Sequence, residues 1–516
     1  MLAASAGAEL ASPSVVLAAL RSAVLLGVDA VPVQVEVDVS NGLPQFAVVG
    51  LPDTAVRESR DRVRSAIRNS GFDFPPHRIT VNLAPADLPK AGTSFDLAIA
   101  LGLLATEGRL PDRALMDALV LGELSLDGGI NPVRGVLAIA LSARRLGITR
   151  LVVPLANAAE AAAAGGLVVL PVSSLAQAVG AIASPGTANL DLPPEGWTPA
   201  PVTHPDLSDV TGQLFARRAL EIAAAGGHNL LLIGPPGAGK TMLARRLPGI
   251  LPPLSFEERL EASVVHSVAG LLPPGAGLLD TRPFRAPHHS ASHVALVGGC
   301  AVPRPGEVTL AHHGVLFLDE CPEFGRRALE ALRQPLEDRH VTVSRAARAV
   351  TFPARFLLVA AMNPCPCGYR GHPTRVCVCT AAQIDRYTAR LSGPLLDRID
   401  LTVQVASVPA AELTGDAVTE SSPAVRLRVQ RARDLQQARS ADTGVPTNGD
   451  LRGRPVLAAC RPDDAAVRLL RRAAERLGLS ARSHHRVLSV ARTIADLSGS
   501  GGVEAVHVAE ALQYRG

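Results

Sequence analysis

The segment Gly234–Thr241, with the sequence GPPGAGKT, constrains this chain more than any other stretch. It follows the apolar run Asn229–Ile233, which indicates a buried parallel strand, and it precedes residues that predict the start of a helix. A strand, a glycine-rich loop ending in Gly-Lys-Thr and a helix form the arrangement that a phosphate-binding loop requires. In this arrangement backbone N–H groups and the positive end of the helix dipole face a phosphate.

Lysine is so rare in this chain that its presence in the loop is informative. Only two of the 51 Lys and Arg residues are lysines, Lys90 and Lys240. Phosphates in such a loop need a compact ammonium group, which a guanidinium cannot replace. We therefore predict an ATP site at Gly234, Pro235, Pro236, Gly237, Ala238, Gly239, Lys240 and Thr241. The alternative is an ordinary Gly/Pro turn before a helix.

The composition limits the other functions that are open to the chain. Its 516 residues are 47% hydrophobic and 19% charged, as in a globular protein of several domains. Aromatic residues are only 3% and the net charge is +4, which argues against a base-stacking surface and confines any nucleic-acid contact to local patches. We recognise no signal peptide and no apolar run of about 18 residues, so we expect no membrane contact. The seven cysteines fit a reducing compartment, and we expect a cytoplasmic protein.

A second apolar run ends in residues that suit ATP hydrolysis. The run Gly314–Leu318 closes on Asp319 and Glu320. Parallel α/β sheets bind ligands at the carboxyl ends of their strands. Asp319 is therefore expected to hold Mg²⁺ together with Thr241, and Glu320 to act on the attacking water as a general base. A strand that ends in a solvated pair of acids is the alternative.

The N-terminal part of the chain predicts an α+β domain. Residues 33–49 give a strand–turn–strand signal around the turn 41–44. Residues 53–70 predict a helix that is capped by Asp53. Its five arginines are expected to form a solvated face paired with neighbouring acids, and a polyanion-binding face is the alternative.

Residues Leu88–Leu97 and Gly122–Gly128 resemble the proteolytic domain of Lon-type proteases, which has a ribosomal-S5-like fold. Ser94 falls where that family has its nucleophile. The resemblance places the catalytic lysine of the family at Leu137, and no lysine lies between Lys90 and Lys240. Because a serine without its base is a poor nucleophile, we expect no peptidase activity, with Ser94 acting as a helix cap.

Long motifs elsewhere resemble the YifB/ComM family of magnesium-chelatase-like AAA+ proteins. They are RPFRAPHH at Arg282–His289, PGE at Pro305–Glu307, LAHHGVLFLDE at Leu310–Glu320 and SGPLLDRID at Ser392–Asp400. The resemblance covers nearly the whole chain and implies an oligomeric ring, usually a hexamer. For ComM it implies an ATP-driven DNA helicase that promotes branch migration while transformed DNA recombines.

Two other functions stay open beside the helicase. One is a chelatase-type motor that remodels a protein partner for metal insertion, against which the Lon-like domain argues. The other is an ATP-dependent protease, against which the missing lysine argues.

The resemblance also assigns roles to three further residues. Asn363, which ends the apolar run Phe356–Met362, fits the sensor-1 position that orients the water. Arg398 matches an arginine finger that reaches the γ-phosphate bound by a neighbouring subunit. A local ion pair with Asp397 or Asp400 is the alternative for Arg398. Arg482 fits a sensor-2 arginine, for which Arg486 is a competitor.

Three further groups of residues are candidates for binding a metal or DNA. Cys365, Cys367, Cys377 and Cys379 can bind a structural Zn²⁺ tetrahedrally, or they are reduced thiols on a loop. Residues 340–352 predict a hairpin whose tip carries Arg345 and Arg348. In related helicases such a hairpin grips DNA phosphates in the ring pore, whereas here it can also merely cap the sheet. The histidine-rich segment 288–293 can be a metal site, but because no carboxylate partner is visible nearby we expect it instead to belong to an insertion near the pore.

The chain is therefore predicted to be α/β, with three domains. An S5/Lon-like α+β domain covers residues 1–183 and a linker residues 184–206. An AAA+ core with a parallel sheet covers residues 207–405. A second linker covers residues 406–423, and a helical lid covers residues 424–516.

Overall fold

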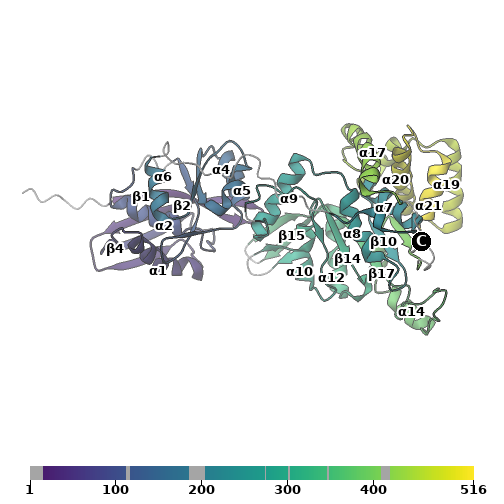
Figure 1. Ribbon diagram of the computed structural model, residues 1–516, viewed down its shortest axis with the longest axis horizontal. Coiled ribbons are helices and arrows are strands. Elements are labelled where there is room, and N and C mark those ends of the chain that lie inside the picture. The colour runs from purple at the N-terminus through teal and green to yellow at the C-terminus, as the bar shows by residue number, and fades with distance from the viewer. Residues whose placement is uncertain are drawn as a thin grey trace, which may run out of the picture. The chain divides into compact units, whose positions relative to one another are not determined.

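The structure is a computed structural model, and it describes residues 16–111, 115, 117–184, 204–273, 275–299, 303–345, 348–407 and 419–515. It divides into two compact units, of which the first is Met1–Ala200 with His266–Leu278 and the second is the remainder (Figure 1). Most of the predicted first linker lies outside the described residues. Within the described ranges, no helix combines the length and the apolar character that a membrane crossing requires.

The first unit is built on a seven-stranded sheet with the order β3-β4-β2-β1-β5-β8-β9. Its strands are β1 Val16–Leu26, β2 Asp29–Ser40, β3 Gln45–Val49, β4 Arg78–Ala84, β5 Ala118–Val120, β8 Arg150–Pro154 and β9 Val168–Val172, and a separate small ladder is formed by β6 Glu123–Leu124 and β7 Ile130–Asn131. Its helices are α1 Thr54–Asn69, α2 Asp96–Thr106, α4 Val136–Arg145, α5 Ala158–Ala162 and α6 Leu175–Ala183, with the 3₁₀ turn η1 Leu155–Asn157.

The turn at residues 41–44 joins two strands that are not neighbours in the sheet. The strand β4 lies between them, antiparallel to β2 and parallel to β3. The alternation of apolar and polar residues predicted both strands, but local sequence does not specify which strand pairs with which.

The first helix begins as predicted, because the Asp53 carboxylate accepts a hydrogen bond of 2.8 Å from the Val56 N–H. One of its arginines is not on the solvated face. Arg62 donates to the Asp96 carboxylate, with 2.6 Å from Nε, and the Asp96 side chain is only 1% exposed. Burial raises the pKa of Asp96, and the hydrogen bonds from Arg62 oppose that rise.

Replacing Arg62 with methionine is expected to destabilise the first unit by about 3 kcal/mol, because it leaves the buried Asp96 carboxylate without its cation. Hydrogen exchange of α2 in the full chain, followed by mass spectrometry, measures this change. The control is Arg60→Met, since Arg60 pairs with Asp61 at the surface, where both side chains are more than half exposed. Its expected effect is much smaller, because exposed ion pairs contribute little to stability. Equal effects of the two variants would contradict the prediction.

Ser94 does not cap a helix, so that expectation was wrong. The helix α2 begins at Asp96, Phe95 occupies the N-cap position, and no side chain caps the helix end. Ser94 instead forms a backbone hydrogen bond, in which its carbonyl oxygen accepts from the Gly122 N–H at 3.1 Å. Leu137, which stands where the family has its lysine, is fully buried in α4.

The second unit is built on a five-stranded, entirely parallel sheet with the order β11-β14-β17-β10-β18. Its strands are β10 Leu230–Ile233, β11 Phe284–Arg285, β14 Val315–Leu318, β17 Leu357–Met362 and β18 Leu401–Gln404, and two hairpins are formed by β12 Gly298–Gly299 with β13 Arg304–Pro305 and by β15 His340–Arg345 with β16 Arg348–Pro353. The helices before the C-terminal region are α7 Leu214–Gly226, α8 Lys240–Ile250, α9 Phe256–Ala269, α10 His293–Val297, α11 Glu307–Leu310, α12 Arg326–Ala331, α13 Arg333–Asp338, α14 Ala381–Thr388 and α15 Gly393–Leu396, with the 3₁₀ turns η2 Leu207–Asp209 and η3 Cys321–Glu323.

Both faces of this sheet are buried, which explains why its strands are continuous apolar runs. Alternate residues of one strand belong to different cores. In β17, Val359 lies in the cluster that contains α7 and α8, whereas Leu358 and Ala360 lie in the cluster that contains α12 and α13. The prediction of a central parallel sheet is confirmed.

The C-terminal region is helical, as predicted, and it shares its core with the sheet. Its helices are α17 Ser422–Thr443, α18 Arg454–Cys460, α19 Asp464–Leu477, α20 Ala481–Ser498 and α21 Ala505–Gln513, with the 3₁₀ turn η4 Asn448–Asp450. Val429 of α17 and Ile494 of α20 belong to the same buried cluster as Leu230 of β10. The second predicted linker lies outside the described residues between positions 408 and 418.

Candidate nucleotide-binding site

The glycine-rich loop joins β10 to α8 and has the backbone shape that the sequence requires. Gly237 and Gly239 have φ values of +78° and +88°, in the left-handed region that favours glycine. Gly239 is the N-cap of α8, and Lys240 is its first residue. Gly234 passes so close to β18 that a Cβ atom there would lie 2.2 Å from the Val405 carbonyl oxygen. The loop is therefore held between two strands and the start of a helix.

The Lys240 ammonium group lies inside this loop. Its Nζ donates to the carbonyl oxygens of Gly234 at 2.6 Å and Pro235 at 2.9 Å, and to Asn363 Oδ1 at 3.1 Å. Burial lowers the pKa of Lys240, and the carboxylates of Asp319 and Glu320 oppose that shift. Lys240 and Asn363, the residue predicted as sensor 1, are 123 positions apart in sequence and are in direct contact.

Thr241 and Asp319 also meet, as their predicted shared role requires. The Thr241 hydroxyl donates to Asp319 Oδ2 at 2.6 Å, and Asp319 Oδ1 accepts from the Glu320 N–H at 3.0 Å. A hydroxyl and a carboxylate beside a phosphate loop fit Mg²⁺, which binds to one or two protein oxygens and completes its shell with phosphate and water.

Glu320 lies at the end of β14 in a conformation that few residues other than glycine adopt, with φ of +49°. Its side chain is 55% exposed, and its Oε2 atom lies 3.5 Å from His289 Nδ1. The expectation that the histidine-rich segment lacks a carboxylate neighbour was therefore wrong. The sequence contains no signal for this contact, because His289 and Glu320 are brought together by the path of a loop.

Asn363 reaches the site because β17 lies between β10 and β14. All three strands are parallel, so their carboxyl ends place the phosphate loop, Asn363 and Asp319 along one edge. The strand that comes last of the three in the chain lies in the middle, and this crossover brings together the residues predicted to act in hydrolysis.

Arg398 lies at the opposite end of the strands, where they begin. Its backbone carbonyl accepts from Asn229 Nδ2 at 2.8 Å, just before β10 begins. From Asn229 to Gly234 the strand extends roughly 16 Å, at about 3.3 Å per residue. Arg398 is therefore remote from its own chain's phosphate site, and its role as an arginine finger stays a prediction.

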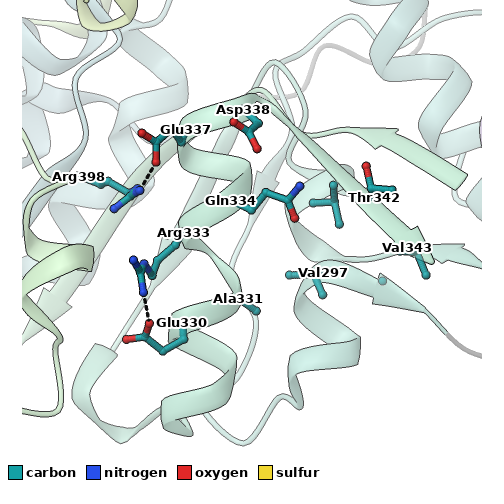
Figure 2. Close-up of a pocket in the computed structure, with 12 residues that line it drawn as sticks. Val297, Glu330, Ala331, Arg333, Gln334, Glu337, Asp338, Thr342, Val343 and Arg398 are labelled. Atoms are coloured by element: carbon teal, nitrogen blue, oxygen red, sulfur yellow. Dashed lines mark hydrogen bonds and ion pairs between the residues drawn. The ribbon is translucent and has the colours of Figure 1, made fainter. Parts of the chain in front are cut away.

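The arginines predicted as finger and sensor 2 share one carboxylate, Glu337 of α13. Arg398 forms an ion pair with Glu337 rather than with Asp397 or Asp400, and Arg482 Nη2 lies 3.4 Å from Glu337 Oε1. Arg398 and Glu337 are among the residues that line a cavity of about 560 Å³, and Figure 2 shows the ion pair between them. The competing Arg486 is buried, donates to the Ile399 carbonyl and lies 3.6 Å from Asp400.

The predicted hairpin exists as β15 and β16, with Arg345 and Arg348 as the last residue pair before its tip. The tip residues 346–347 lie outside the described residues, as do the side chains of both arginines. Their contact with DNA stays a prediction.

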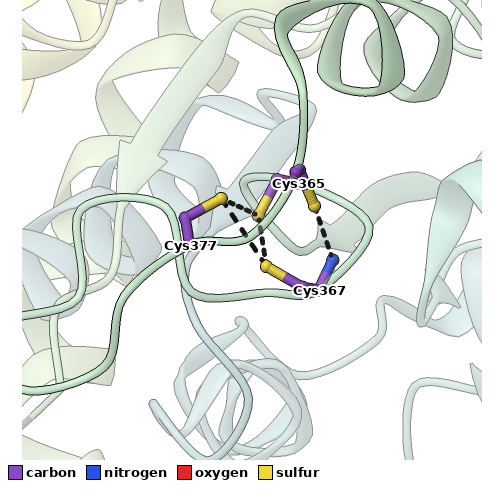
Figure 3. A group of neighbouring side chains, drawn as sticks. Cys365, Cys367 and Cys377 are labelled. Atoms are coloured by element: carbon purple, nitrogen blue, oxygen red, sulfur yellow. Dashed lines mark hydrogen bonds between the residues drawn. The ribbon is translucent and has the colours of Figure 1, made fainter.

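The four clustered cysteines converge. Figure 3 shows Cys365, Cys367 and Cys377, whose sulfurs are 3.4 Å apart for the first two and 3.6 Å for the other pairs. Cys379 Sγ accepts from the Cys367 N–H at 3.4 Å, and the four sulfurs lie within 4.8 Å of one another. Backbone N–H groups of Tyr369 and Val378 lower the pKa of Cys367 to about 6, whereas burial and the neighbouring thiols raise the pKa of Cys377 and Cys379.

The comparisons with known proteins cover most of the chain. The family described as magnesium chelatase, subunit ChlI matches residues 206–413, subunit ChlI of Mg-chelatase matches residues 35–157, and the subunit ChlI C-terminal family matches residues 419–515.

Three curated proteins illustrate the similarity. The chain is 46% identical to YifB of Salmonella typhimurium over 510 residues, which are 97% of each protein. It is 46% identical to the competence protein ComM of Haemophilus influenzae over 508 residues, again 97% of each. A Lon protease of Chloroflexus aurantiacus is 31% identical over 131 residues, 24% of this chain and 16% of that protein, in keeping with a Lon-like domain.

Family membership indicates an ATPase. The identity at full length agrees with the parallel sheet, the phosphate loop and the helical C-terminal region. The chain belongs to the YifB/ComM family of magnesium-chelatase-like AAA+ proteins.

Proposed function

We propose that this protein is a ring-forming motor that couples ATP hydrolysis to the remodelling of DNA, as a ComM-like branch-migration helicase. The observation that carries the ATPase part is the pair of contacts from Thr241 to Asp319 and from Lys240 to Asn363. They bring together residues at the carboxyl ends of β10, β14 and β17, which supply the groups that phosphoryl transfer requires.

Each residue has a distinct role in the proposed reaction. Lys240 and the loop N–H groups bind the phosphates, and Thr241 and Asp319 would hold Mg²⁺, which when bound neutralises charge on the phosphates. Glu320 accepts a proton from the attacking water, and Asn363 orients that water. The side-chain exposure of Glu320 leaves it accessible to water.

A ring is part of the proposal because Arg398 is remote from the phosphate loop of its own chain. An arginine finger supplied by a neighbouring subunit completes such a site and stabilises charge in the transition state. Arg482 lies on the same carboxylate as Arg398, which supports a role for it at the same subunit interface. A repeated head-to-tail interface forms a ring when its rotation closes, and we propose that here it closes as a hexamer.

DNA is the proposed substrate. Support comes from the full-length similarity to the competence protein ComM and from the hairpin β15–β16. Repeated in every subunit, Arg345 and Arg348 would form a basic ring despite the small net charge of the chain. The proposal also includes a structural Zn²⁺ at Cys365, Cys367, Cys377 and Cys379, where the sulfur geometry fits one tetrahedral ion.

The experiment that tests this function measures ATP hydrolysis with no DNA, with duplex DNA and with a four-way junction, together with dissociation of the junction. We expect stimulation by the junction and ATP-dependent dissociation. Hydrolysis that no DNA form changes, with no dissociation, would rule out the helicase.

The double variant Arg345→Ala/Arg348→Ala is expected to lose stimulation by DNA while it keeps its DNA-free ATPase rate. If each arginine neutralises one phosphate, the slope of the salt dependence of DNA binding should fall by about 0.9 for each arginine removed. The control is Arg326→Ala/Arg327→Ala, which removes two exposed arginines from α12. Equal loss of stimulation in both variants would contradict a specific role for the hairpin.

A further inference from the structure

The segment between β17 and α14, residues 363–380, has no helix or strand of its own, and the structure describes all of it. We call residues 365–379 the cysteine loop. It starts two positions after Asn363, the residue that bonds to Lys240. A loop of this length without regular structure needs some other constraint to hold a fixed position. The four cysteines are the groups that can supply it.

The sulfur positions fit a single metal ion. Four sulfurs bonded to one Zn²⁺ at about 2.3 Å lie about 3.8 Å from one another. The observed separations of 3.4 and 3.6 Å are close to this value. An iron–sulfur cluster, with its own sulfides between the irons, would keep the cysteine sulfurs farther apart. Backbone N–H groups of Cys367 and Arg370 donate to the Cys379 and Cys365 sulfurs, each at 3.4 Å, and so help to hold these two sulfurs in position.

The cysteine loop also packs directly on the phosphate loop. At Gly368, where φ is +83°, a Cβ atom would lie 2.6 Å from Pro236 Cδ and 3.8 Å from Asn363 Cγ. The backbone of Gly368 therefore fills the space between a residue of the phosphate loop and the sensor-1 residue. Lys240 bonds to that same Asn363 at 3.1 Å, so the three parts form a continuous contact.

We infer that the cysteine loop is a zinc-dependent brace that fixes the phosphate loop and Asn363 relative to each other, so that zinc controls nucleotide binding and turnover. This inference rests on the zinc site and the ATP site of the proposed function. Zinc takes no part in the chemistry. It would cross-link Cys365, two positions after Asn363, to Cys377 and Cys379 at the far end of the loop. The fixed backbone of Gly368 would then hold Pro236 in place.

The first test separates the brace from the metal. Gly368→Ala leaves all four cysteines in place but forces a Cβ against Pro236. We expect the purified full chain to keep about one zinc ion and to turn over ATP about 100-fold more slowly, as a misplacement near 1 Å produces. The control is Gly371→Ala in the same loop. Gly371 has a similar φ of +75°, but its Cβ would meet nothing within 4 Å, so turnover should stay near that of the wild type.

The second test removes the metal. Cys377→Ser/Cys379→Ser should lose its zinc, measured by elemental analysis, and bind a fluorescent, slowly hydrolysed ATP analogue at least about tenfold more weakly. The control Cys460→Ala alters a buried cysteine outside the loop and should change neither reading. Three outcomes would overturn the inference: wild-type protein that holds no zinc, a metal content of iron, or a zinc-free variant that binds the analogue normally.

These readings are independent of DNA. If DNA leaves ATP hydrolysis unchanged while Gly368→Ala still slows it, the helicase proposal fails and the brace stands. If the junction is dissociated but Gly368→Ala and Gly371→Ala behave alike, the brace fails and the helicase stands.

Discussion

The Glu320→Gln variant is expected to bind ATP like the wild type and to hydrolyse it at least about 100-fold more slowly, the smallest usual contribution of a general base. Glutamine keeps the shape of the side chain and its neighbour His289, but it cannot accept the proton of the attacking water. Binding of the fluorescent ATP analogue and release of phosphate under single-turnover conditions measure the two steps separately.

The matched control is Glu323→Gln, three positions further along. Glu323 is also a partly exposed carboxylate, and it bonds to Arg390 at 2.7 Å. Its replacement should leave hydrolysis within about twofold of the wild type, since surface ion pairs contribute little. Normal turnover by Glu320→Gln would remove Glu320 from the catalytic site.

Arg398→Ala is expected to lower ATP turnover by about 10³-fold or more, the effect of removing an arginine finger. The effect should depend on neighbouring subunits, because within one chain Arg398 and Lys240 lie at opposite ends of the strands of the sheet. Lys240→Ala and Arg398→Ala are each expected to be inactive alone. In a one-to-one mixture, an interface is active when one subunit supplies an intact Lys240 and its neighbour an intact Arg398. A randomly mixed ring should therefore regain activity at about a quarter of its interfaces.

Recovery in the mixture also shows that both variants are folded. The control is Arg333→Ala, which removes an arginine at the same cavity that pairs with Glu330 at 2.9 Å instead of Glu337 (Figure 2). It should stay active by itself. A mixture without recovery, formed from variants that still assemble, would mean that no site is shared between subunits.

The positions of the residues proposed for hydrolysis could be predicted from the sequence because their signals are local. A parallel strand ends where its apolar run ends, and the residue that follows lies at the ligand-binding edge. Asp319 needed only this rule, whereas the role expected of Asn363 also required the family resemblance. Their contacts with Thr241 and Lys240 follow from the strand order of the sheet, in which β17 lies between β10 and β14.

Contacts between distant elements could not be predicted in this way. Nothing in the periodicity of α1 distinguishes Arg62 from the other arginines, because Asp96 becomes its partner only when two helices pack. Glu337 likewise has no motif, although it binds two arginines that the resemblance had assigned. The position of β4 between β2 and β3 depends on long-range pairing, whereas a turn specifies only the direction of the chain.

The shared core of the sheet and the C-terminal helices restricts how members of this family can exchange parts. Alanines of α7, such as Ala219 and Ala223, belong to one buried cluster with Val425, Val429 and Ala432 of α17. Interiors this closely packed accept a larger side chain on one element only if its partner becomes smaller. A C-terminal region taken from a relative would therefore fit this chain only together with its matching α7, so the two segments should be inherited as a pair.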